Sequence, residues 1–124
     1  MTLMSDAVAD GALDVIATCT RVSACSSQPA NYAGIAAVSL GSYTLTAGDG
    51  NGDWTIANGD TSGRKITLGA QSGNNGTATG AANSLAYDDA TTLHFATAGD
   101  GDTINSGSPW TLGAYDVTEL ADPA

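Results

Sequence analysis

The first part of the chain spaces its apolar side chains as an α-helix does. Five of them fall at positions i, i+4, i+7, i+8 and i+11 and so share one stripe at helical period: Val8, Ala12, Val15, Ile16 and Cys19. Ser5 is a suitable N-cap and Asp6 suits the positive end of the helix dipole, whereas Gly11 weakens the helix locally. The pattern predicts a helix over roughly residues 5–18, able to dock on the same domain or to reach a neighbour.

Beyond this helix the pattern changes to short runs in which apolar and polar positions alternate. The clearest is GRKITLGA at residues 63–70, with Ile66 and Leu68 on one face and Lys65 and Thr67 on the other. The other runs predicted as strands lie at residues 20–26, 35–40, 43–46, 54–57, 77–87, 91–98, 103–105 and 110–120. Turns rich in Gly, Asp and Asn separate these runs, as at residues 73–76.

About seven to nine short strands with frequent turns predict a mainly β protein, built as an antiparallel β-sandwich or barrel with a short N-terminal α-helix. Strands do not alternate with helices, so a parallel sheet is not expected. No internal repeat or linker divides the chain. We therefore expect a helical arm at residues 1–19 and a β-sandwich domain at residues 20–124, which together form one compact domain.

The large apolar side chains are few for a chain of 124 residues. Much of the apolar fraction of 42% is alanine, and aromatic residues make up only 6%. A thin core of this kind is marginal alone and often depends on association with other chains. The composition thus favours a protein that binds further copies of itself or another protein.

Charge narrows the range of partners. The chain has 13 acidic residues against Arg21, Arg64 and Lys65, and a net charge of −10. No basic stripe is present to displace counterions from a phosphate backbone, so we expect no binding to nucleic acid or to an anionic membrane surface. A basic partner surface or a bound cation is compatible with the charge, but solubility through self-repulsion is the preferred explanation.

The N-terminal sequence is the opposite of a secretory signal. Asp6, Asp10 and Asp14 lie where a signal peptide has basic residues and then an apolar stretch. No segment has the roughly 18 uninterrupted apolar residues of a membrane span. We expect the protein to fold in the cytoplasm where it is made.

The two cysteines have no metal-binding or redox spacing. Cys19 and Cys25 lie six positions apart, and the single histidine, His94, is distant in sequence, whereas zinc requires three or four close ligands. The spacing is also not that of a C-x-x-C redox pair. Two alternatives remain, namely two small buried residues or a disulfide formed after release into an oxidising medium, within the chain or between subunits.

Catalytic patterns are missing from the sequence. A Ser–His–acid or Cys–His arrangement would have to use His94, which falls in a strand pattern between Leu93 and Phe95 with no glycine loop beside it. The carboxylates cluster in turns, where Asp is favoured for its local hydrogen bonds. No phosphate-binding glycine motif occurs. The sequence predicts a protein that is not an enzyme.

One turn has the outline of a calcium loop. Asp49, Asn51 and Asp53 supply oxygen ligands at alternate positions, and Asp60 follows eleven residues after Asp49. The pattern departs from the usual loop because Trp54 occupies the sixth position, where glycine is expected, and aspartate replaces the final glutamate. These four residues are candidate Ca²⁺ ligands, and a hairpin turn explains the same residues without a metal.

Several longer phrases together carry a family resemblance. They are SDAVADGALDVIA, TRVSACSSQPANY, GRKITLGAQSG, TATGAANSLAYDD and SPWTLGAYDVTELADPA. In these phrases, from about residue 5 to residue 124, the chain resembles small structural proteins of tailed bacteriophages and their prophages, and residues 48–60 fit least well. The resemblance implies a virion component that binds other copies of itself or a shell protein, and it carries over no active site.

Four functions follow in order of preference. The first is a capsid decoration (cement) protein, a homo-oligomer such as a trimer, that binds the major capsid protein or another protein of the virion. The second is a tail, neck, baseplate or fibre subunit whose loops at residues 48–60 and 99–109 contact a host sugar, with Trp54, Tyr43 and Trp110 as stacking candidates. The third is a calcium-stabilised carbohydrate-binding module, and the last is an enzyme that uses His94.

Overall fold

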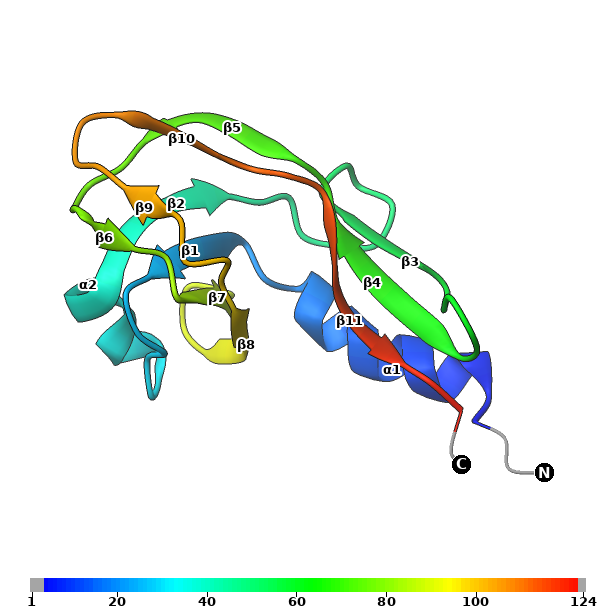
Figure 1. The fold of residues 1–124 in the computed structure, drawn as a ribbon. Helices are drawn as coiled ribbons and strands as arrows, with labels where there is room; N and C mark the ends of the chain where they lie inside the picture. Colours follow the sequence, from blue (N-terminus) through cyan, green and yellow to red (C-terminus); the bar gives the residue numbers. More distant parts are fainter. Residues whose placement is uncertain (1–3, 123–124) are drawn as a thin grey trace. The chain divides into compact units, whose positions relative to one another are not determined.

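The computed structural model describes residues 4–122 and is mainly β (Figure 1). The helix α1 (Asp6–Ala17) precedes all strands, and the short helices η1 (Tyr32–Gly34) and α2 (Ile35–Val38) lie between β1 and β2. The strands are β1 (Arg21–Cys25), β2 (Ser39–Thr44), β3 (Trp54–Asn58), β4 (Arg64–Leu68), β5 (Gln71–Asn75), β6 (Gly80–Ala81), β7 (Ser84–Asp88), β8 (Leu93–Ala98), β9 (Thr103–Ile104), β10 (Pro109–Leu112) and β11 (Tyr115–Leu120).

The predicted fold class is confirmed in its main features. The chain has an N-terminal helix, and every ladder between named strands is antiparallel. The strands form sheets in the orders β2-β1-β7-β8, β11-β4-β3, β10-β5 and β6-β9, and no closed barrel forms among the described residues. Eleven strands replace the expected seven to nine, mainly because two of the predicted runs each divide into two strands and because Gln71–Asn75 forms a further one.

Several local predictions were wrong. The single strands expected at residues 77–87 and 110–120 are each divided, the first into β6 and β7 and the second into β10 and β11. Residues 35–40 were expected to be a strand, but Ile35–Val38 forms α2, because alanine favours a helix and Ile35 buries itself against Cys25 and Ala86. Residues 73–76 were expected to turn, but Gln71–Asn75 forms β5. This polar segment becomes a strand because it pairs with β10, so a tertiary contact overrides its weak β-propensity.

The chain forms two compact units, which are described separately. The first, here the helical unit, comprises the described residues up to Thr18, then Thr46–Ala70 and the described residues from Gly113 onward. The second, here the large unit, comprises Cys19–Leu45 and Gln71–Leu112. The chain first leaves the helical unit between Thr18 and Cys19, one residue before the expected boundary between the helical arm and the β-sandwich domain. It returns to the helical unit at Thr46 and again at Gly113.

In the helical unit, α1 packs on β3 and β4. The Ser5 side chain caps the helix by accepting a hydrogen bond from the Val8 backbone N–H. The helix buries one face against the sheet: Ala9, Leu13, Ile16 and Ala17. The expected stripe is therefore divided, since Val8 and Val15 are 63% and 49% exposed. The expected face begins at Val8 and the buried face begins at Ala9, and both have the spacing i, i+4, i+7, i+8. Burial of the second face places Leu13 in the core.

Because α1 packs on the sheet through the face that contains Leu13, Asp10 lies beside Arg64 on β4. The guanidinium Nε lies 2.8 Å from one carboxylate oxygen and Nη2 lies 3.5 Å from the other, while Nη1 donates to the Asn58 side chain. The hydrogen bond to Asp10 is the main reason that the pKa of Arg64 is raised. This two-pronged contact ties the helix to the sheet, whose core contains the fully buried side chains of Trp54, Ile66 and Leu68.

In the large unit, β7 lies inside the four-stranded sheet and is buried along its whole length. A separate ribbon of β5 and β10 is held to β2 by aromatic contact. The Trp110 ring lies 4.6 Å from the Tyr43 ring, and the Tyr43 hydroxyl donates to the Trp110 carbonyl oxygen. Gly41 leaves room for the indole, because a Cβ there would lie 2.7 Å from Trp110 Nε1.

None of the helices within residues 4–122 has the length and apolar character needed to cross a membrane.

Candidate functional site

His94 belongs to a network that fixes the turn between β7 and β8. Its Nε2 lies 2.8 Å from Asp89 Oδ2, and the other carboxylate oxygen accepts hydrogen bonds from Thr91 N, Thr91 Oγ1 and Thr92 N at 2.9, 2.8 and 2.7 Å. These bonds, that from Thr92 N above all, lower the pKa of Asp89. The stabilisation they provide is therefore present above the ordinary pKa of 3.8 and is lost as the pH falls toward the lowered folded-state pKa.

A half-buried ion pair between Arg21 and Asp88 holds the start of the same turn. Asp88 is almost fully buried, and its carboxylate accepts from Arg21 Nε at 2.8 Å and from the Ala90 backbone N–H at 3.0 Å. Ala90 has a φ of 77°, a left-handed conformation that is unusual for a residue with a Cβ. The turn is thus held in one conformation by side chains that bond back to its own backbone.

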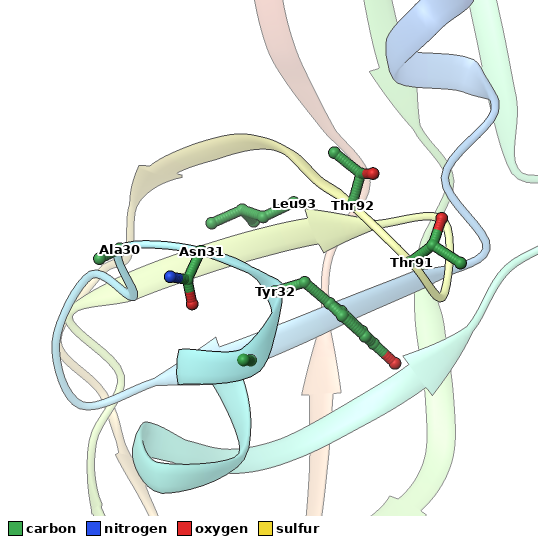
Figure 2. A pocket seen from close by; sticks show the side chains of 7 residues that line it. Ala30, Asn31, Tyr32, Thr91, Thr92 and Leu93 are labelled. Atoms are coloured by element: carbon green, nitrogen blue, oxygen red, sulfur yellow. The ribbon is translucent and has the colours of Figure 1, made fainter.

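A pocket of about 340 Å³ lies beside this turn in the large unit. One wall consists of residues 30–33, which contain the start of η1, and the other consists of residues 91–93. Figure 2 shows the side chains of Asn31 and Tyr32 on the first wall and those of Thr91, Thr92 and Leu93 on the second. No sequence pattern indicated this site; the only available signal was an aromatic residue in the polar loop that follows Pro29.

The candidate calcium ligands are engaged in hydrogen bonds of their own. Asp49 Oδ1 accepts from Ile56 N at 2.8 Å, Asp53 Oδ2 accepts from Thr46 N at 2.6 Å, and Asn51 Nδ2 donates to the Ala47 carbonyl oxygen. In residues 4–122 no three His, Cys, Asp or Glu side chains gather as a metal-binding group. These bonds are those of a turn, and the calcium site stays a prediction.

The fourth candidate calcium ligand, Asp60, belongs to an ion-pair network. Lys65 Nζ lies 2.8 Å from Asp60 Oδ1 and 3.2 Å from Asp116 Oδ2. The pKa of Lys65 is raised, chiefly by its hydrogen bond to Asp60. A cation that bound Asp60 would therefore have to compete with the lysine for its carboxylate.

The three residues expected to stack on a sugar, Trp54, Tyr43 and Trp110, have less exposed rings than sugar stacking requires. Trp54 is fully buried in the core of the helical unit and Tyr43 is 3% exposed, so neither presents a ring face to solvent. Trp110 is half-buried against Tyr43 and Gly41. This corrects the assignment of Trp54, whose position at the start of β3 pairs it with Leu68 inside the sheet.

Both cysteines are fully buried and neither is in a disulfide, which agrees with the first of the two alternatives. Burial is the largest cause of their raised pKa values, about 12 for Cys19, where Asp88 and Asp89 add to the effect, and about 11 for Cys25. A thiol with so high a pKa carries almost no thiolate at neutral pH, and thiolate is the reactive form.

We therefore expect neither thiol to react with a disulfide reagent such as DTNB at pH 8 until the large unit opens. Denaturant should expose both Cys19 and Cys25, and the reaction rate in native conditions should follow the population of the open state. Absorbance of the released thiol anion measures both quantities. Rapid native reaction of either cysteine, in a protein that circular dichroism shows to be folded, would contradict the burial described above.

Comparison of the chain with models of protein families, with curated proteins and with solved structures finds no match.

Proposed function

We propose that this protein is a non-catalytic structural component of a bacteriophage virion, and specifically a decoration protein that stabilises the capsid through protein–protein contacts. The family resemblance supports this assignment, as does an acidic surface compatible with a basic patch on a partner. His94, the one catalytic candidate, serves as a partner of Asp89 in a turn. A protein of this kind acts through the surface it presents.

The observation that carries the proposal is an apolar strip on the solvent side of α1. Val8 and Val15 are the exposed large apolar side chains of the described residues, and they lie on one face of the helix with the exposed Ala12 between them. The helix is fixed to its sheet by the buried face and by Asp10, so the strip is presented on a supported element. Apolar side chains displayed in this way favour contact with another protein.

The test is the copy number of the protein in purified particles, measured by peptide mass spectrometry relative to the major shell protein. A ratio close to one is expected for a decoration protein. A ratio of a few per cent would overturn the capsid assignment in favour of a tail, neck, baseplate or fibre subunit. Absence from the particles would overturn the virion assignment itself.

The strip can be tested separately in the double variant Val8→Ser/Val15→Ser. Loss of about 1.4 kcal/mol of contact energy, a modest amount for two truncated valines, would weaken binding to shells or to further copies about tenfold. The thermal midpoint should change little, because both side chains face solvent. Sedimentation velocity and co-pelleting with shells measure the association.

The matched control for the double variant is Ala7→Ser, an exposed position on the same helix outside the strip. It should bind as the original protein does. Equal association of the control and the double variant would show that the strip is not the contact surface.

A further inference from the structure

The pocket beside the β7–β8 turn belongs to the large unit and contains none of the residues of the strip on α1. Its walls, residues 30–33 and 91–93, contain no charged side chain, although the chain has a net charge of −10. An uncharged lining favours a neutral ligand, because a charged ligand would lose its hydration without gaining an ion pair. The lining is also amphipathic, since it combines the Tyr32 ring and Leu93 with an amide and hydroxyl groups (Figure 2).

The polar groups of the pocket have hydrogen-bonding capacity to spare. The Asn31 Oδ1 atom caps η1 by accepting from Gly34 N at 3.0 Å, which leaves the two amide N–H donors of Asn31. Within residues 4–122 these donors, the Tyr32 hydroxyl and the Thr92 hydroxyl form no hydrogen bond with another protein group. Both walls of the pocket thus offer polar groups to a ligand.

The walls are held in place before any ligand arrives. Asn31 is fixed by its capping bond, and the Arg21 guanidinium lies 5.6 Å from the centre of the Tyr32 ring while its Nε bonds to Asp88. On the other wall, Asp89 accepts bonds from both Thr91 and Thr92, as described above. A site ordered in this way loses little conformational entropy when it binds.

From these features we propose that the pocket binds one neutral pyranose ring of a sugar. Ring C–H groups of a sugar suit the face of Tyr32 and the side chain of Leu93, and its hydroxyls suit the Asn31 amide and Thr92. The volume is at the lower end of the range for ligand sites, about 300–1,000 Å³, and so fits one ring. Most of the lining residues are exposed, so affinity is weak, with a Kd of about 1–10 mM for one site.

The proposal is tested by titrating the ¹⁵N-labelled full chain with neutral methyl glycosides of glucose, galactose and N-acetylglucosamine, up to about 50 mM, about five times the upper expected Kd. At least one sugar is expected to give saturable amide shifts confined to residues 30–34 and 89–95. The absence of saturable shifts with all three glycosides and with the three corresponding reducing sugars, or shifts that map elsewhere, would overturn it. Equal binding of methyl glucuronide, which is anionic, would overturn the assignment of a neutral ligand.

Variants identify the groups that bind. Thr92→Val removes an exposed hydroxyl with little change of shape, and Asn31→Ser keeps a capping oxygen while removing the amide; each should weaken binding at least threefold. Tyr32→Ala should abolish it. Thr55→Val, the same change as at Thr92 but on an exposed position of β3, should leave the titration unaltered. Unchanged affinity in all three pocket variants, with the fold intact by amide dispersion, would overturn the assignment of the site.

The source of the sugar is distinguished by a second comparison. A free hexose and the end of a glycan chain share the same ring, but only the glycan end has its anomeric oxygen blocked. Binding of the methyl glycoside and of a disaccharide with the same terminal ring supports the site and identifies a chain end. Binding of the reducing sugar alone supports the site and identifies a free monosaccharide.

Discussion

Trp54→Ala is expected to lower the free energy of unfolding by about 3–5 kcal/mol. The indole is 0% exposed, opposite Leu68 on β4, and its removal leaves a large cavity in the small core of the helical unit. Natural domains have only about 5–15 kcal/mol of stability, so a substantial fraction would be lost. Urea denaturation followed by circular dichroism measures the effect.

The neighbouring Thr55 supplies the control, because its side chain is exposed on the same strand. Thr55→Ala should change the stability by about 0.5 kcal/mol or less. If Trp54→Ala does not fold, Trp54→Phe, which keeps part of the apolar volume, should fold with an intermediate loss. A Trp54→Ala protein as stable as Thr55→Ala would show that the indole is not in the core.

Gly63→Ala is expected to cost about 2–4 kcal/mol for two separate reasons. Gly63 has a φ of 68°, which disfavours any residue with a Cβ. The added Cβ would also overlap the carbonyl oxygen of Leu120 and lie 2.9 Å from the Cα of Ala121. Backbone atoms cannot move aside as a flexible side chain can, so the pairing of β4 with β11 would have to shift.

Gly50→Ala separates the two causes, since Gly50 has a similar φ of 79° but nothing within 4 Å of an added Cβ. It should cost only the conformational term, about 1–2 kcal/mol. Thermal and urea unfolding of both variants give the difference. Equal losses would mean that the contact with Leu120 is relieved at no cost.

Local sequence signals were sufficient to predict those helices and strands that tertiary contacts do not alter. The capping group of Ser5, the period of the first helix and the alternation of residues 63–70 each produce a hydrogen-bonded or half-buried structure within a few residues. The abundance of turn residues predicted many short antiparallel strands for the same reason. The polar segment Gln71–Asn75 was missed because its strand exists only through pairing with β10.

The candidate site depended on contacts that no local pattern contains. The sequence by itself determined a helix, a set of antiparallel strands, an acidic surface and the scarcity of catalytic groups. Tertiary structure decided which of two equivalent helix faces is buried, because Leu13 and Asp10 find partners on only one side. It also buried Trp54 and brought residues 30–33 beside residues 91–93. Burial and proximity arise from the packing of segments far apart in the chain, which periodicity and composition do not specify.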